Sequence, residues 1–414
     1  MPELRRVVIT GIGAVTPIGL GVEGLWTGLR GRRSAVRCIT RFDPTVFKSR
    51  IAGEVDDFVA SDHIEERRAR RLDRYSAFTI AATRMALDDA SLDVRKEDPD
   101  RIGAMMGTAL GGVAHGERQY HNFLTGGPRA VDPALALTVF AGAASCNIAI
   151  EFGCTGPNST NGMSCASGAI AIGDAFRAIA RGEADAMIAG GAEAPLAPLC
   201  FGAFALIRAM STRNDDPTHA SRPFDAGRDG FVMAEGAAVL ILEERGRALA
   251  RGAPVYAEIC GFGLTNDAHH MTAPRPDGRQ AARAIRIALS EARVEPREIG
   301  YINAHGSSTP LNDSTETGSI NQVFGDHARH LALSGTKGYF GHALGASGAI
   351  EAAICALASR RGWVPPTVNL ETPDPACDLD HVRGEGREME PEYLLSNSFG
   401  FGGINAALVF RRAG

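Results

Sequence analysis

The chain has 414 residues, 44% of them hydrophobic and 22% charged, which is enough for one large globular unit or two fused ones. Its 43 lysine and arginine residues against 48 aspartate and glutamate residues give a net charge of −5, which argues against nucleic acid as a partner. Neither an export signal nor an apolar stretch of the ~20 residues that a membrane helix requires is visible, so we expect a cytoplasmic protein with no membrane partner.

The first predicted strand, 7–10, runs into a glycine-containing turn. Such turns also occur in dinucleotide-binding proteins, but Thr16 stands where their fingerprint has its third glycine, so the signal for a nucleotide cofactor is weak. Further along, an amphipathic helix ends at 86–90, and after a polar loop an apolar strand at 102–107 stops at the glycine-rich segment 107–112. That segment lacks the Lys-Ser/Thr ending of a phosphate loop, and we expect its backbone to pack closely against a helix or a ligand chain.

Three segments of the chain recur later in the same order. The matching pairs are 8–13 with 258–263, 86–108 with 288–306, and 166–170 with 346–350, where both copies read Ala-Ser-Gly-Ala-Ile and open a predicted helix. Three matches in one order predict a duplicated α/β unit with halves 1–253 and 254–414. We expect layered helices and sheets with mixed, largely parallel strands, and the two Ala-Ser-Gly-Ala-Ile helices should meet near a pseudo-twofold axis.

Cys165 lies in a turn of small residues directly before the first of these two helices. A thiol at a helix N-terminus is close to the positive end of the helix dipole, which favours the nucleophilic thiolate. The alternative is a buried cysteine that acts as a small hydrophobic side chain, as most free cysteines do. All eight cysteines lack C-x-x-C spacing, and we expect free thiols and no bound metal.

Two histidines occupy positions related to that of Cys165. His305 follows a predicted strand, and His342 precedes the second repeat helix. A lone histidine is usually a hydrogen-bonded structural residue, but α/β proteins place ligand sites at such strand and helix ends. We therefore expect Cys165, His305 and His342 to share one cleft. The adjacent His269 and His270 lack further ligands at metal spacing and do not predict a metal site.

Several motifs follow one another along the chain in a recognisable order. They are the cysteine turn 162–168, the block from Ser211 to Phe231, Asn-Ala-His-Gly at 303–306, Thr-Lys-x-x-x-Gly-His at 336–342 and Phe-Gly-Phe-Gly-Gly at 399–403. On these residues the chain resembles, over essentially its whole length, a β-ketoacyl-acyl-carrier-protein synthase of the elongating Cys-His-His type. The resemblance implies the thiolase fold, in which two similar α/β halves build five layers in the order α-β-α-β-α. It also implies an acyltransferase that forms carbon–carbon bonds.

The resemblance implies a role for each matching residue. Cys165 would hold the growing acyl chain as a thioester, with the backbone N–H groups of Cys165 and Phe401 as oxyanion donors. His305 and His342 would stabilise the enolate that forms when malonyl-carrier loses carbon dioxide, and this carbanion would attack the acyl-cysteine. Lys337 would belong to the catalytic residues as a buried cation. The network that supports it would comprise Glu351, Asp313 and Glu316.

The substrates would arrive on the 4′-phosphopantetheine arm of acyl carrier protein, and no cofactor would be bound. The substrate contacts that the resemblance implies are Ser307, Thr309, Phe204, Leu110, Ala134 and Ala136. Arg70 and Arg71 match positions that contact the carrier in related synthases, although Glu65 and Glu66 beside them are typical of a solvated helix face. Arg208 lies just past Phe204, and we expect it to contact the carrier as well. The second subunit would be an identical chain or a ketosynthase-like chain-length factor.

The chain shares features with two branches of this family. Segments 213–225 and 231–236 resemble the ketosynthase α-subunit of dissociated bacterial polyketide synthases, whereas Asn-Ser-Phe-Gly-Phe-Gly-Gly at 397–403 is closer to fatty-acid synthase II. Ala134 and Ala136 are smaller than the side chains usual in synthase II enzymes, which suggests a longer or differently shaped acyl tunnel. We therefore expect the polyketide type, with fatty-acid biosynthesis as the alternative.

Three other functions fit the residues less well. A degradative thiolase would need a second catalytic cysteine near the C-terminus, and no cysteine follows Cys377. A non-catalytic chain-length-determining subunit would lack the nucleophile, whereas Cys165 and both histidines are present. A nicotinamide oxidoreductase is disfavoured by Thr16 in the glycine turn.

Overall fold

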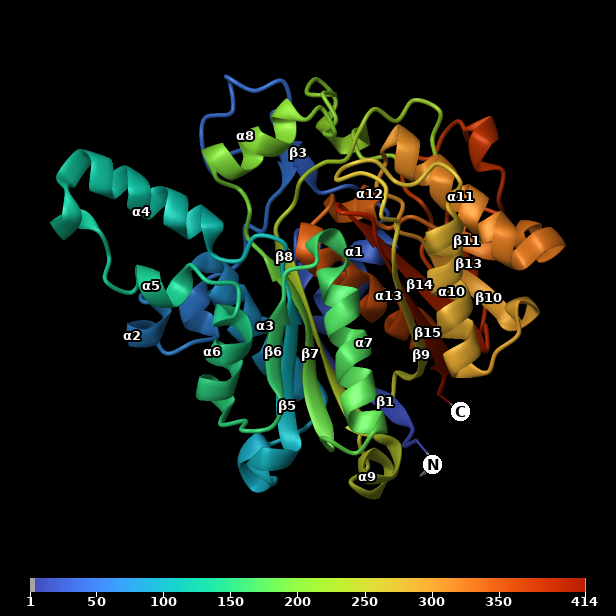
Figure 1. The fold of residues 1–414 in the computed structure, drawn as a ribbon, viewed down its shortest axis with the longest axis horizontal. Coiled ribbons are helices and arrows are strands. Elements are labelled where there is room, and N and C mark those ends of the chain that lie inside the picture. The colour runs from blue at the N-terminus through green and yellow to red at the C-terminus, as the bar shows by residue number, and fades with distance from the viewer. Residues whose placement is uncertain (1–3, 414) are drawn as a thin grey trace.

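The computed structural model describes residues 4–413, which fold into layers of helices and strands. Figure 1 shows two groups of strands with helices between them and further helices on both outer sides. The helices between the strand groups are α7 (Ser167–Ala180) and α13 (Ser347–Arg361). On the outer faces, α3 (Arg74–Asp89) packs on the strands of the first half, and α10 (Arg279–Ala292) packs on those of the second half. The order of layers is therefore α-β-α-β-α, as the resemblance implied.

Two groups of strands with the same internal order form the central sheet. The first group runs β1 (Val7–Thr16), β8 (Gly236–Glu244), β7 (Ala186–Glu193), β5 (Ile102–Gly107) and β6 (Asn158–Asn161). The second runs β9 (Ala257–Asn266), β15 (Ile404–Arg412), β14 (Tyr393–Gly400), β10 (Ile299–Asn303) and β11 (Ala332–Ser334). The groups join where Val7, Val8 and Ile9 of β1 pair with β9. One strand order used twice confirms the duplication that the sequence repeats predicted.

The remaining helices and strands surround these layers. The further helices are α1 (Gly21–Gly31), α2 (Glu66–Ala69), α4 (Val113–Gly126), α5 (Leu135–Thr138), α6 (Ala143–Phe152), α8 (Pro198–Leu206), α9 (Arg245–Ala250), α11 (Pro310–Phe324) and α12 (Lys337–Phe340). The further strands are β2 (Gly19–Leu20), β3 (Val36–Cys38), β4 (Ile51–Gly53), β12 (Trp363–Val364) and β13 (Arg387–Glu388). Within residues 4–413, no helix is both long enough and apolar enough to cross a membrane.

The strand directions differ from the prediction of a largely parallel sheet. In each half only the three strands at the outer edge run parallel: β6, β5 and β7 in the first, β11, β10 and β14 in the second. The other pairs of the main sheet are antiparallel. The turn 401–403 joins β14 directly to antiparallel β15 with no helix between them. Where strands and helices alternate, consecutive strands are expected to be parallel and joined by a helix. This rule fails for β15, which follows β14 through a short turn and runs antiparallel to it.

The helices α7 and α13 cross with their backbones in contact. A Cβ atom on Gly168 would lie 2.9 Å from the backbone nitrogen of Ala349, and one on Gly348 would lie 2.8 Å from that of Ala169. Side chains cannot be accommodated at such distances, so glycine is required at both positions. The crossing confirms that the two repeat helices meet, and it brings the turns that precede them close together.

Candidate active site

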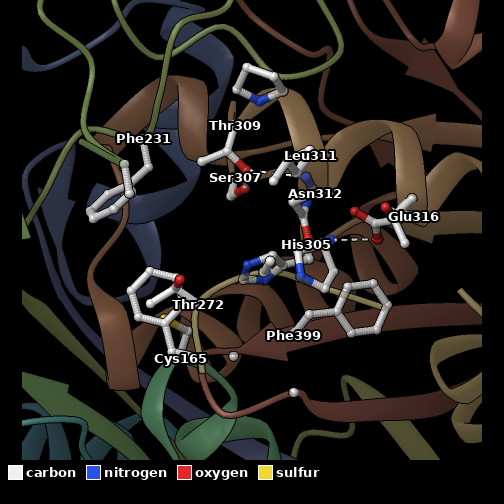
Figure 2. A pocket seen from close by; sticks show the side chains of 18 of the residues that line it. Cys165, Phe231, Thr272, His305, Ser307, Thr309, Leu311, Asn312, Glu316 and Phe399 are labelled. Atoms are coloured by element: carbon white, nitrogen blue, oxygen red, sulfur yellow. Dashed lines mark hydrogen bonds between the residues drawn. The ribbon is translucent and has the colours of Figure 1, made fainter. Parts of the chain in front are cut away.

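A pocket of about 390 Å³ opens beside the starts of the two central helices. Cys165, His305 and His342 all line it. Figure 2 shows Cys165 at one end of the view, Thr309 at the other and His305 between them. The structure thus brings the cysteine and both histidines into one cavity, as the positions of the repeats predicted. Within residues 4–413 no group of three or more His, Cys, Asp or Glu side chains is arranged to hold a metal ion.

Cys165 lies in the 3₁₀ turn Ser164–Ala166, which leads into α7. Ser164 has a left-handed backbone with φ 53°, which is uncommon for a residue other than glycine. The hydroxyl of Ser167 stabilises this turn by sharing its one proton between the carbonyl oxygens of Ser164 at 2.7 Å and Thr108 at 2.9 Å. The matching turn before α13 has the same left-handed feature at Leu344, with φ 41°. The sharp turn presents the thiol to the pocket while the chain continues into the helix.

The turn that follows β14 lies against the cysteine. The backbone N–H of Phe401 acts on the sulfur of Cys165 in the direction that lowers the pKa of the thiol. The ring of Phe401 stacks on Phe204 with the ring centroids 6.1 Å apart. A Cβ atom on Gly400 would lie 3.2 Å from the backbone nitrogen of Cys165, so glycine keeps the space beside that N–H open. The N–H groups of Cys165 and Phe401 are therefore neighbours at the sulfur.

The rings of His305 and His342 lie side by side, with centroids 5.3 Å apart and planes at 79°. Nδ1 of His305 is 3.4 Å from the ammonium of Lys337. Because an ammonium has no lone pair, this Nδ1 must be the acceptor, which places the ring proton on Nε2. Nδ1 of His342 is 2.8 Å from the hydroxyl of Ser347. No group within residues 4–413 bonds to Nε2 of either ring, so both nitrogens are available to a ligand.

Lys337 is fully buried behind the histidines. Its ammonium donates to the Glu351 carboxylate and to the carbonyl oxygen of His305. A buried charge is tolerated when an opposite charge and hydrogen bonds satisfy it, and Lys337 has both. The ion pair between Lys337 and Glu351 that the sequence predicted is therefore present.

Two further buried carboxylates hold the backbone around His305. Glu316 accepts the N–H groups of His305 and Gly306, each at 2.9 Å. Asp313 accepts the N–H of Phe224 at 2.8 Å and lies 3.6 Å from the guanidinium of Arg228. Both residues belong to α11. This helix therefore fixes the segment that carries His305.

Small hydroxyl side chains line the outer part of the pocket. The hydroxyls of Ser307 and Thr309 are 2.9 Å apart, and both residues line the cavity. Phe204 and the exposed Arg208 also line it. All four residues therefore lie in the wall of the same cavity as Cys165.

Other predicted contacts lie outside the open cavity. Leu110 packs against the apolar cluster around Cys165. Ala134 and Ala136 do not line the pocket: Ala134 is half-buried and Ala136 exposed, both at the short helix α5. Figure 1 shows why, since α4 and α5 extend away from the body of the chain. Neither residue therefore lines the open cavity of the single chain, and their place at the end of the acyl pocket stays a prediction.

Arg70 and Arg71 are also absent from the cavity wall. They follow α2, both are exposed, and neither lines the pocket. Arg70 forms an ion pair with Glu66, one helical turn earlier. This agrees with the solvated helix face that their acidic neighbours indicated.

Comparison with known proteins identifies the family. Sequence models of the N-terminal and C-terminal domains of β-ketoacyl synthase match residues 4–248 and 256–371. The chain belongs to the β-ketoacyl synthase family. It is 49% identical to the 3-oxoacyl-[acyl-carrier-protein] synthase 2 of Synechocystis sp. (strain ATCC 27184 / PCC 6803 / Kazusa) over 99% of both chains.

Solved ketosynthases share its fold. One is the ketosynthase of a type II polyketide synthase in complex with its acyl-carrier protein and bound to the hexaketide, with a TM-score of 0.93, 36% identity, and coverage of 99% of this chain and 100% of that chain. Another is the ishigamide ketosynthase/chain length factor, with a TM-score of 0.92, 38% identity and the same coverage. The synthase is therefore an acyltransferase that forms carbon–carbon bonds and has the thiolase fold.

Burial controls the protonation of the site in this synthase. It raises the pKa of the Cys165 thiol, although the Ser164 hydroxyl and the charge of Lys337 act in the opposite direction. Burial outweighs these effects, so the pKa of the thiol lies above its ordinary value, and the expected effect of the helix start on the thiolate stays a prediction. Burial, and then the charge of Lys337, lowers the pKa of His305 and of His342 well below the usual range. Both rings are thus neutral at pH 7.

We expect Lys337→Met to lower the free energy of unfolding of the synthase by about 3–5 kcal/mol, because the Glu351 carboxylate would stay buried without its cation. Decarboxylation of a malonyl thioester should fall as well, since the charge near both histidines is lost. Urea unfolding followed by circular dichroism and release of labelled carbon dioxide measure the two effects.

The double variant Lys337→Met/Glu351→Gln serves as the control for this prediction. It should recover much of the stability but not the decarboxylation, because the unpaired carboxylate is gone while the cation is still missing. If Lys337→Met alone were as stable and as active as the wild-type synthase, the buried ion pair of Lys337 and Glu351 would be contradicted.

Sequence reasoning missed one fully buried carboxylate close to the pocket, that of Glu193 at the end of β7. Burial raises its pKa to about 7, against four hydrogen-bond donors that act in the opposite direction. The sequence does carry a signal, because Gly190-Gly191-Ala192-Glu193 puts an acidic residue directly after an apolar strand. Because α/β proteins place ligand sites at strand ends, an acidic residue in this position is a candidate site residue.

Proposed function

We propose that this synthase extends acyl chains held on acyl carrier protein by decarboxylative condensation with malonyl-carrier, as a step of fatty-acid biosynthesis. The observation that carries the proposal is the shared pocket, in which the Cys165 thiol lies with two neutral histidines whose Nε2 atoms are free to bind a ligand. The substrates would arrive on the phosphopantetheine arm of the carrier, and the chemistry needs no bound cofactor.

In the first half-reaction, the Cys165 sulfur attacks the thioester carbonyl of the acyl-carrier. The sulfur–carbon bond to Cys165 forms, the bond to the carrier sulfur breaks, and the proton of the Cys165 thiol is passed on so that the carrier leaves as a free thiol. The N–H groups of Cys165 and Phe401 stabilise the oxyanion of the tetrahedral intermediate. Their proximity at the sulfur supports this assignment.

In the second half-reaction, malonyl-carrier loses carbon dioxide and leaves an enolate of its thioester. Neutral His305 and His342 donate through Nε2 to the enolate oxygen, and Lys337 keeps Nδ1 of His305 in the acceptor state. The enolate carbon then attacks the acyl-cysteine carbonyl and expels the Cys165 thiolate, which takes up a proton. The three carboxylates act indirectly: Glu351 holds the ammonium of Lys337, and Glu316 and Asp313 hold the backbone around His305.

Other predicted contacts follow the path of the substrate. We infer that Ser307 and Thr309 bind the phosphopantetheine arm, because their hydroxyls line the outer pocket. Phe204 and Phe401 stack on each other in the wall of the same pocket, where they would admit the acyl chain. Leu110 belongs to the apolar surroundings of Cys165 that would receive the chain.

The choice of pathway rests on the relatives. The curated relative at 49% identity is named a 3-oxoacyl-[acyl-carrier-protein] synthase 2, which favours fatty-acid biosynthesis over the polyketide type that the sequence analysis preferred. Polyketide synthesis is the second candidate, because ketosynthases described as polyketide enzymes or paired with a chain length factor share the fold at 36% and 38% identity.

One experiment tests the pathway. The purified chain is incubated with octanoyl-carrier and excess malonyl-carrier, and the products are identified by mass. A fatty-acid enzyme should add one two-carbon unit and stop at the β-ketoacyl-carrier until the ketone is reduced. Repeated unreduced extensions, or activity only after a chain-length factor is added, would replace the proposal with the polyketide type.

We expect Arg208→Glu to raise the KM for acyl-carrier about tenfold while changing the KM for an acyl-pantetheine far less. A chain of net charge −5 does not attract an acidic carrier as a whole, so docking requires local cations near the pocket, and Arg208 is exposed at its edge. Steady-state kinetics with both substrates measure the effect.

The matched control is Arg297→Glu. Arg297 is an exposed arginine in the 3₁₀ turn Pro296–Glu298, which precedes β10, whereas His305 follows the other end of that strand. This variant should leave both KM values unchanged. Arg70→Glu and Arg71→Glu test whether the docking surface extends to α2. Equal losses with carrier and pantetheine substrates for Arg208→Glu would contradict a docking role.

We also propose that a second synthase chain covers the face formed by α4, α5 and β6. β6 is the edge strand of the sheet, and large apolar side chains on α4 and α5 are exposed, with Tyr120 at 62%, Leu124 at 63% and Leu137 at 70%. Ala134 and Ala136 lie in this segment and would face the partner subunit. Sedimentation of the purified chain should give a homodimer; a monomer that pairs only with a chain-length factor would favour the heterodimer.

A further inference from the structure

The carboxylate of Glu193 joins two segments that come from different halves of the chain. Its Oε1 accepts the hydroxyl of Thr108 at 3.0 Å and the N–H of Leu110 at 3.1 Å. Its Oε2 accepts the N–H groups of Ala109 at 2.6 Å and Gly345 at 3.0 Å. Residues 108–110 follow β5 in the first half, and Gly345 lies in the turn before α13 in the second.

The two segments touch each other directly at this point. A Cβ atom on Gly345 would lie 2.4 Å from the backbone nitrogen of Ala109, which leaves no space for a side chain between them. Glu193 is fully buried, and no lysine or arginine within residues 4–413 forms an ion pair with it. The four donors therefore stabilise its negative charge, while burial acts against that charge and raises its pKa to about 7.

Both segments form walls next to Cys165. Leu344, adjacent to Gly345, is buried in the same apolar cluster as Cys165 and lines the pocket. Ala109 and Leu110 pack against this cluster from the other segment. The hydrogen bonds of Glu193 thus set the separation of two apolar walls beside the nucleophile.

We propose that Glu193 is a positioning residue that fixes the width of the acyl-binding space between Leu110 and Leu344, and thereby sets which chain lengths the synthase accepts. The inference rests on the proposed function, because it takes the apolar surroundings of Cys165 as the space for the acyl chain. A butyryl group contacts only the first part of these walls, whereas a long chain packs along their whole length and loses more contact when they shift.

The first test variant is Glu193→Gln, which keeps the size of the side chain. Its single carbonyl oxygen can accept only one pair of the donors, and its NH₂ group then opposes the other pair. Either residues 108–110 or the turn of Gly345 should shift. We expect the rate of Cys165 acylation by the longest saturated acyl-carrier that the wild type accepts to fall about tenfold relative to the rate with butyryl-carrier.

The matched control is Glu243→Gln. Glu243 is an equally buried carboxylate at the opposite end of the β7–β8 strand pair, where it bonds to Thr10, Arg247 and Arg251. This variant should lose stability as Glu193→Gln does, but its ratio of long-chain to short-chain rates should equal that of the wild type.

A milder variant keeps the inference testable if Glu193→Gln does not fold. Thr108→Val preserves the shape of the side chain and removes one donor to Glu193, together with the acceptor for the N–H of Gly111 at 2.9 Å. It should shift the rate ratio in the same direction by a smaller factor. Intact-mass measurement of the acylated protein gives every rate.

The outcomes separate this inference from the proposed function. If neither carrier acylates wild-type Cys165, the proposed function fails and the inference fails with it. If the wild type is acylated but the folded Glu193 and Thr108 variants keep its rate ratio, only the inference is overturned. A fall of both rates by one factor would make Glu193 a residue of general stability and would also overturn it.

Discussion

Replacing Cys165 with alanine should yield a folded protein that accepts no acyl group, with acyl transfer reduced at least ~10³-fold. Cys165 alone among the eight cysteines lines the pocket and lies next to the N–H groups that would hold the oxyanion. Its side chain is 7% exposed and small, so its truncation should cost about 1 kcal/mol of unfolding free energy. Intact mass after incubation with acyl-carrier measures the transfer.

Two other buried cysteines provide matched controls. Cys154→Ala and Cys200→Ala remove thiols whose pKa values burial raises to about 11 and about 12. Both variants should still become acylated, because neither thiol lines the pocket. Peptide mapping that located the acyl group on Cys154 or Cys200 would contradict the assignment of the nucleophile.

His305→Ala and His342→Ala should each slow release of carbon dioxide from malonyl-carrier by about 10²–10³-fold, the usual cost of losing one oxyanion donor. Acylation of Cys165 should continue in both, because the N–H groups of Cys165 and Phe401 do not depend on these rings. The geometry that motivates the prediction is the pair of neutral rings, 5.3 Å apart, with both Nε2 atoms free. Labelled carbon dioxide and intact mass report the two half-reactions separately.

His381→Ala is the control for the histidine variants. His381 is also buried, with its Nε2 bonded to the carbonyl oxygen of Cys377 and its ring against Phe224, but it does not line the pocket. Its removal should reduce stability and leave decarboxylation unchanged at temperatures where the variant is folded. Normal decarboxylation by both His305→Ala and His342→Ala would rule out the enolate role.

The duplicated architecture and the grouping of Cys165, His305 and His342 could be predicted because they depend on short-range signals that recur in sequence. Two copies of Ala-Ser-Gly-Ala-Ile mark equivalent helices, and Gly168 and Gly348 within them fit where the helices cross. The residues directly before the helices then had to be close together.

The other features of the fold and of the site depend on properties that the order of residues in the sequence does not report. The direction of β15 is set by a three-residue turn rather than by a crossover helix. The pKa of Cys165 is dominated by burial, which no local motif reports. The hydrogen-bond donors to Glu193 belong to residues 108–110 and 345, which are far from it in sequence. The position of Ala134 depends on how far α4 and α5 extend from the body of the chain.

The full burial of Lys337 has a practical consequence for chemical labelling. The chain has only three lysines, and the other two, Lys48 and Lys96, are exposed and absent from the pocket wall. An amine-reactive fluorophore would therefore attach to at most these two side chains and the α-amino group. Lys48→Arg or Lys96→Arg would leave a single reactive lysine. The arrival of a labelled carrier could then be followed by energy transfer without any modification inside the cavity.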